Sequence, residues 1–184
     1  MTIATLFFVL NPAAVAVIWL GYRHNGASRE RGLAQLLPVV AAAVAALALA
    51  VLVGAPLLDA LDVSDATFRI AAGTLVVFGA LQAFLGFGLR HALATRMWLV
   101  VAALVWLAAP PAAAAAVAIR LDDGVAAGLM WAAAGVVVAT GLGFLWTRYA
   151  GDGYPLVLGV IRRVLAAGAV FGGVDLIRQG VLSI

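Results

Sequence analysis

The sequence predicts an all-α integral membrane protein with six transmembrane helices, arranged as two inverted three-helix repeats in which helices 1 and 4 are discontinuous. Hydrophobic residues make up 66% of the 184 residues and charged residues 10%, whereas soluble domains carry about a quarter charged residues. The apolar residues fall into blocks of about 18 or more, a length that crosses a bilayer. The segment 68–88 recurs near the C-terminus, with residues 69–73 lying over 163–167 at an offset of 94 residues.

We therefore interpret residues 1–184 as a single transmembrane domain, with repeat 1 at about 1–90 and repeat 2 at about 96–184. The chain has no Cys, which excludes disulfides, thiol catalysis and Cys-based metal sites. His24 and His91 both fall in predicted loops, so we expect no metal centre and no cofactor. The net charge of +3 comes from Arg residues in loops between spans and does not indicate nucleic-acid binding.

The first span is predicted at 3–20 and is interrupted by Asn11-Pro12. We expect a transmembrane helix there and not a signal peptide, because the segment lacks a basic start and its apolar run continues past Pro12. Ser28 is a plausible N-cap that leads into the second span. The remaining spans are predicted at 36–58, 68–88, 98–119, 125–146 and 158–181.

The loops alternate in charge. Eight Arg residues fall on one side of the membrane: Arg23, Arg29, Arg31, Arg90, Arg96, Arg148, Arg162 and Arg163. The other side has Arg69, Arg120 and Arg178 with most of the acidic residues. Basic loops stay in the cytoplasm, so both termini are predicted outside, and the odd number of spans per half makes the repeat inverted. All the basic residues are Arg, and the chain is rich in Ala, Gly and Val. This composition favours a bacterial protein, located in the cytoplasmic (inner) membrane.

Prolines interrupt the first span of each half, at Pro12 and at Pro110-Pro111. Proline removes a backbone donor and clashes with the carbonyl four residues back, and a freed carbonyl in lipid must find a partner in protein or in a wet cavity. Breaks at matching places in two inverted halves commonly form a substrate site at the midplane, where half-helix N-termini favour a carboxylate or another anion. The alternative is that these prolines are ordinary kinks.

Three polar side chains within the spans are candidate site residues. Asn11 could hydrogen-bond a solute, or could cap the second half of its span with Pro12 at the first helical position. Gln82 could line a cavity or form an interhelical hydrogen bond. Asp175, an acid well inside a span, is either a coupling residue for a proton or cation or the partner of Arg178 at i+3.

Small residues mark the helix faces expected to pack closely. Gly168 and Gly172 form a GxxxG pattern, which permits close contact within the monomer or in a homo-oligomer. Thr140 is expected to bond the backbone of its own helix.

The chain resembles the MarC family of six-span membrane proteins, which includes transporters of small neutral amino acids. The resemblance rests on LFFVLNPAAVAVIWL from Leu6, SRERG from Ser28, LLDALDVSDATFRIAAGTLVVFGALQAFLG from Leu57 and RRVLAAGAVFGGVDLIRQGV from Arg162. It implies two inverted three-helix repeats with broken first and fourth helices, a fold related to LysE-type exporters. The family's first-helix motif matches at Asn11-Pro12, and its fourth-helix motif falls at 108–113.

The leading functional hypothesis is a secondary transporter of a small solute that works by alternating access, with Asn11, Pro12, Pro110, Pro111 and Gln82 at the substrate site. The alternative is a non-transporting membrane scaffold or accessory subunit with a degenerate transporter fold. An enzyme is not expected, because the chain lacks HExxH, Ser-His-Asp and paired-carboxylate arrangements. The expected partners are the lipid bilayer and a small-molecule solute.

Overall fold

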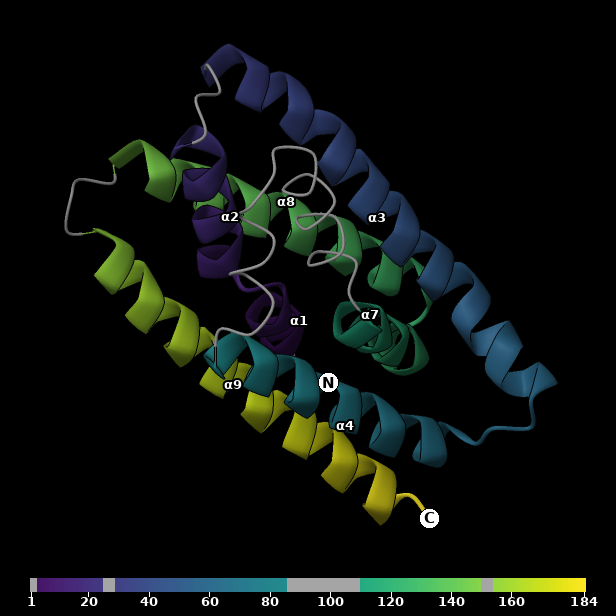
Figure 1. Cartoon of the computed structure of the whole chain (residues 1–184). Helices are drawn as coiled ribbons and strands as arrows, with labels where there is room; N and C mark the ends of the chain where they lie inside the picture. The colour runs from purple at the N-terminus through teal and green to yellow at the C-terminus, as the bar shows by residue number, and fades with distance from the viewer. Residues whose placement is uncertain (1–2, 25–28, 86–109, 150–153) are drawn as a thin grey trace.

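A computed structural model describes residues 3–24, 29–85, 110–149 and 154–184, and every element within them is an α-helix (Figure 1). The helices are α1 (Ile3–Leu10), α2 (Pro12–His24), α3 (Arg29–Ala60), α4 (Asp65–Leu85), α7 (Pro110–Asp123), α8 (Val125–Tyr149) and α9 (Tyr154–Leu182). The predicted all-α class is confirmed in these parts of the chain. Ser28, residues 86–88 and residues 98–109 lie outside the described residues.

Four of the described helices are long and apolar enough to cross a membrane. The segments are Leu37–Ala60, Asp65–Leu85, Val125–Thr147 and Leu156–Leu182, and they match the predicted spans at 36–58, 68–88, 125–146 and 158–181. Large apolar side chains on their outer faces are exposed, for example Phe78 at 62% and Phe171 at 77%. Exposed apolar surface of this kind is costly in water but stable against lipid, so these helices indicate a membrane protein.

Local side-chain chemistry explains where α4 begins and how α3 accommodates a proline. Helix α4 begins at Asp65, three residues before the predicted span, because the Ser64 Oγ accepts a hydrogen bond from the Thr67 N–H at 3.2 Å and caps the helix. Helix α3 continues through Pro56 as one 32-residue helix. The Leu52 carbonyl, four residues before Pro56, instead accepts a hydrogen bond from the Arg120 guanidinium at 2.8 Å.

Helix α7 lies at the centre of the bundle and contacts α1, α3, α4 and α8. Figure 1 shows α1 and α7 nearly end-on, between α3 on one side and the α4–α9 pair on the other. Six of the 14 residues of α7 are alanine, and residues 114–119 are all buried. Alanine side chains are short, so neighbouring helices approach this central helix closely.

Helices α4 and α9 run antiparallel along most of their length (Figure 1). A Cβ atom added to Gly73 would lie 2.5 Å from the Gly173 carbonyl oxygen, and one added to Gly173 would lie 2.8 Å from the Gly73 carbonyl oxygen. The two backbones therefore touch, and only glycine fits at either position. On α9, Phe8 of α1 packs against Gly168 and Thr5 of α1 packs against Gly172. The predicted close contact at the GxxxG pattern is therefore confirmed within the chain.

Candidate functional site: the helix break at Asn11

The first apolar segment is broken inside the bundle. Helix α1 ends at Leu10, α2 begins at Pro12, and Asn11 between them has a φ of +45°. Asparagine tolerates this left-handed conformation better than most residues, and Pro12 cannot donate the backbone bond that would continue the helix. Asn11 is only 1% exposed. The predicted discontinuity of the first span is therefore confirmed.

Both polar atoms of the Asn11 side chain are bonded within the protein. The Oδ1 atom accepts a hydrogen bond from the Ala14 N–H at 3.2 Å, and the Nδ2 atom donates to the Arg162 carbonyl at 3.1 Å. The predicted N-cap role is confirmed, with Pro12 at the first helical position. The amide also links the break to α9. A hydrogen bond from Asn11 to a solute stays a prediction, and it would use the second Nδ2 hydrogen.

Helix α2 begins in the interior of the protein. Pro12 and the four residues after it are buried, and a Cβ atom added to Gly143 of α8 would lie 3.1 Å from the Pro12 carbonyl oxygen. Ala13 and Ala16 form a buried cluster with Leu158 of α9. The N-terminus of this half-helix, with its partial positive charge, is therefore enclosed by α8 and α9.

The second predicted break falls at the start of α7. This helix begins at Pro110, which is exposed, whereas Pro111 packs against Gly79 of α4. Leu10, just before the first break, and Ala112, just after the second proline pair, belong to one buried cluster. Pro12 is buried beside α8, Pro111 is partly buried beside α4, and Pro110 is exposed. That the two breaks together form one substrate site stays a prediction. Whether the fourth span is discontinuous depends on residues 98–109, outside the described part of the chain.

Gln82 does not lie with the other candidates. Its side chain is exposed, because the packed face of α4 follows Ala72, Val76, Ala80 and Ala83 and position 82 falls off that face. Among the described residues, Gln82 has no hydrogen-bond partner, so its role in lining a cavity or in an interhelical bond stays a prediction.

Asp175 lies at the far end of α9 from the break. It is thirteen residues beyond Arg162, about 20 Å along a helix. Its carboxylate pairs with Arg178 at 3.4 Å and accepts a hydrogen bond from the Gln179 amide at 2.6 Å. The predicted i+3 ion pair is confirmed, and it places Asp175 outside the site at the break.

Arg162 is a site residue that the sequence analysis missed, because it grouped this residue with the cytoplasmic loop charges. Its Nε atom is buried and has no hydrogen-bond partner, and no carboxylate of the described residues pairs with it. A buried guanidinium nitrogen without a partner is costly. Helical spacing was the available signal: Arg162 follows Leu158 by four residues and precedes Leu165 by three, and both pack against the first turns of α2.

Comparisons with known protein families, with curated proteins and with solved structures found no match. The resemblance of the sequence to the MarC family therefore stays a prediction.

A cavity of about 280 Å³ lies between α1 and α8. Its lining includes Leu6, Phe7, Phe8, Trp131 and Val138. These side chains supply apolar and aromatic surface, so this cavity suits an apolar group such as a lipid tail and lacks the charge that the break provides.

Proposed function

We propose that this protein is a secondary transporter of a small solute, and that the solute binds at the break between α1 and α2. The observation that carries the proposal is a half-helix that begins inside an apolar bundle, with a buried Asn11 at its cap. On the helix that faces it, the buried Nε atom of Arg162 has no hydrogen-bond partner among the described residues. Broken helices in membrane proteins occur where the backbone lines a protein-enclosed or water-filled site, and transporters use them to bind solutes.

The helix contacts support the inverted three-helix repeat that belongs to this proposal. Helix α2 packs against α8 and α9, and α7 packs against α3 and α4. In an inverted repeat, α2, α3 and α4 would correspond to α7, α8 and α9 in that order. Replacing each helix by its counterpart turns the contacts of α2 into the contacts of α7. The α4–α9 and α3–α8 contacts map onto themselves in the same swap. Six spans with both termini outside, as the loop charges predict, fit this arrangement in a bacterial inner membrane.

The charge at the break favours a solute with a carboxylate group. The Arg162 guanidinium carries a full positive charge, and the N-terminus of α2 adds a partial positive charge. A carboxylate would supply the partner that the described residues do not give Arg162. Small neutral amino acids, the solutes implied by the MarC resemblance, meet this requirement.

The test is counterflow of radiolabelled glycine and alanine in proteoliposomes, comparing Arg162→Gln with Arg163→Gln. Arg163 is the matched control, because it is adjacent but exposed. Losing one charged hydrogen-bond partner costs about 1.5–3 kcal/mol, so we expect the KM of Arg162→Gln to rise roughly tenfold or more. Equal transport by the two variants would remove Arg162 from the site, and no saturable flux by folded wild type for any carboxylate solute would contradict the function.

A non-transporting scaffold or accessory subunit is the second candidate. One observation favours it: the Oδ1 and Nδ2 atoms of Asn11 are both bonded within the protein, as expected of a purely structural break. Purification from membranes in mild detergent, followed by mass analysis, tests this candidate. A stoichiometric protein partner together with absent flux would support it.

A further inference from the structure

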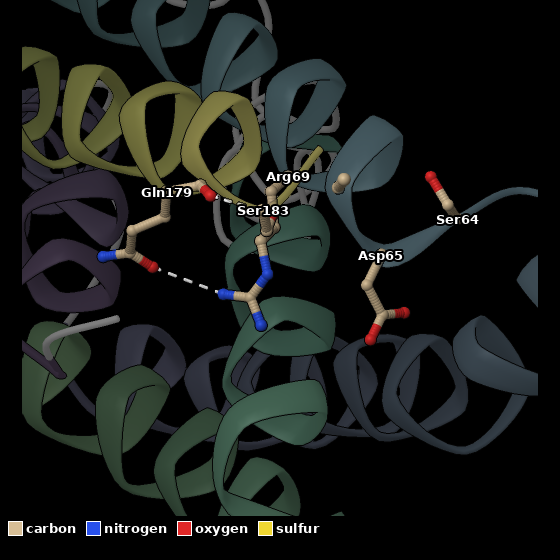
Figure 2. A pocket seen from close by; sticks show the side chains of 6 residues that line it. Ser64, Asp65, Arg69, Gln179 and Ser183 are labelled. Carbon is tan, nitrogen blue, oxygen red and sulfur yellow. Dashed lines mark hydrogen bonds between the residues drawn. The ribbon is translucent and has the colours of Figure 1, made fainter.

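One arginine connects three helices at the end of the bundle opposite the break. Arg69 of α4 donates from Nη1 to the Gln179 Oε1 of α9 at 3.3 Å, and from Nη2 to the Asp122 Oδ1 of α7 at 2.5 Å. Figure 2 shows the Arg69 and Gln179 side chains meeting across the two helices. The Arg69 and Asp122 side chains are 14% and 21% exposed. We call these three residues the Arg69 latch.

The latch separates an open pocket from the apolar interior. On its outer side is a pocket of about 540 Å³, lined by Ser64, Asp65, Arg69, Gln179 and Ser183 (Figure 2). On its inner side, one turn deeper on each of the same helices, a buried cluster includes Ala72, Ala118 and Leu176. These three residues are three or four positions from the latch residues, so they lie on the same helix faces. The latch therefore lies between the open pocket and the buried cluster.

The three latched helices differ in how firmly they are joined. Helices α4 and α9 touch through Gly73 and Gly173, and Gly180 lies against the Ala66 carbonyl. Helix α7 ends at Asp123, just before Gly124, which has a φ of +90°. Pro111, at the start of α7, packs against Gly79 of α4, but nearer the latch α7 contributes only the short side chains of Ala114 and Ala118 to the buried cluster with α4 and α9. Near its C-terminal end, the described polar contact of α7 with the α4–α9 pair is the latch.

We propose that the Arg69 latch is a gate, which opens when α7 moves away from the α4–α9 pair and admits water and solute from the pocket to the interior. This role rests on the transport function proposed above. The charges fit a latch better than a ligand site, because the carboxylates of Asp65 and Asp122 offset the positive charge there and leave no excess for an anion. In the structure described here the gate is closed.

The absence of Cys from the chain permits a test that does not use transport. Ala118→Cys places the only thiol of the protein in the cluster beneath the latch. In membranes, we expect slow reaction of this thiol with a hydrophilic maleimide, and at least tenfold faster reaction when Arg69→Gln or Asp122→Asn is added. Asp123→Asn is the matched control, since Asp123 is adjacent and exposed. The charge swap of Arg69→Asp with Asp122→Arg should restore slow labelling.

A second reporter distinguishes a gate from a general loss of structure. Ala132→Cys lies in the buried cluster on α8, away from the latch, and should stay protected in every latch variant. Faster labelling at both positions, or labelling at Ala118→Cys no faster than in the Asp123→Asn control, would overturn the gate. Because neither reporter requires a solute, the gate can fail while flux persists, and flux can fail while the gate is supported.

Discussion

Asn11 combines a strained backbone conformation with two hydrogen bonds, and the two contributions can be separated by mutation. Asn11→Gly keeps the positive φ available but loses both side-chain bonds, which should cost about 1–2 kcal/mol. Asn11→Ala loses the same bonds and adds the strain of a left-handed non-glycine residue, about 1 kcal/mol more. Thermal unfolding in detergent should therefore rank wild type above Gly and Gly above Ala. Equal losses for the two variants would show that the conformation at this position carries no strain.

Asp122 gives the latch a pH dependence. Burial alone would raise the pKa of this carboxyl, but hydrogen bonds and positive charges around it, those of Arg69 among them, outweigh burial and lower the pKa below its ordinary value of 3.8. The stabilisation is therefore present above pH 3.8 and is lost as the pH falls through the lower folded-state pKa. Because the pair is partly exposed, we expect less than about 1 kcal/mol.

The measurement is the melting temperature in detergent between pH 6 and pH 3. The fall in melting temperature at the acidic end should be smaller in Asp122→Asn than in wild type, while Asp123→Asn should follow wild type. A steeper fall in Asp122→Asn would contradict the sign of the shift.

At the scale of single residues, the sequence predicts contacts between near neighbours in the chain and misses those between residues far apart in the chain. The Asn11 cap follows from an Asn-Pro pair, and the Asp175–Arg178 ion pair follows from i+3 spacing. Arg69 meets a carboxylate 53 positions away and a glutamine 110 positions away. Such partners depend on how the helices pack, which hydropathy does not encode.

At the scale of the helices, a side chain of α7 compensates for a hydrogen bond that a proline removes from α3. Pro56 leaves the Leu52 carbonyl without its N–H partner, and Arg120 of α7 donates to the Leu52 and Val51 carbonyls. We expect Arg120→Gln to cost about 1–2 kcal/mol in wild type. The cost should be smaller in a Pro56→Ala background, where the Leu52 carbonyl regains a backbone donor. A double-mutant cycle of thermal stabilities measures this coupling, and additive losses would mean that Arg120 acts elsewhere.

The contact between α4 and α9 predicts a large difference between two glycine substitutions. Gly73→Ala would force a methyl group to 2.5 Å from the Gly173 carbonyl oxygen, so we expect a loss of about 1–3 kcal/mol. Gly141→Ala on α8 has nothing within 4 Å of the added atom and should be neutral or stabilising by up to about 1 kcal/mol. Melting temperatures in detergent test the pair. Similar effects at both positions would show that α4 and α9 separate easily.

Hydropathy was sufficient to find the four long spans, because block length and composition alone define them. It could not place the start of α4, because a serine cap decides it. It also could not indicate which arginine of another helix bonds the Leu52 carbonyl in α3. The exposed position of Gln82 could not be predicted for a related reason. Which face of a helix packs depends on its neighbours, and an Ala-rich helix has little amphipathic pattern to indicate it.

For the whole molecule, the proposed topology places the latch and the predicted loop at 147–155 on opposite sides of the membrane. Ser64→Cys, at the exposed turn beside the latch, should react with an impermeant maleimide added to intact cells. Gly151→Cys, in that predicted loop, should react only after permeabilisation. Reversed labelling would invert the proposed orientation, and labelling of both from outside would contradict the inverted six-span arrangement.

The alanine composition of α7 has a thermodynamic consequence for any movement of that helix. Alanine has no side-chain rotamers, so moving a surface made of alanine neither freezes nor frees side-chain conformations. The two arrangements of α7 would then differ mainly in a few polar contacts, each of about 1 kcal/mol. Free energies of that size leave both arrangements populated at body temperature, so a small bound molecule would have enough differential affinity to reverse their ratio.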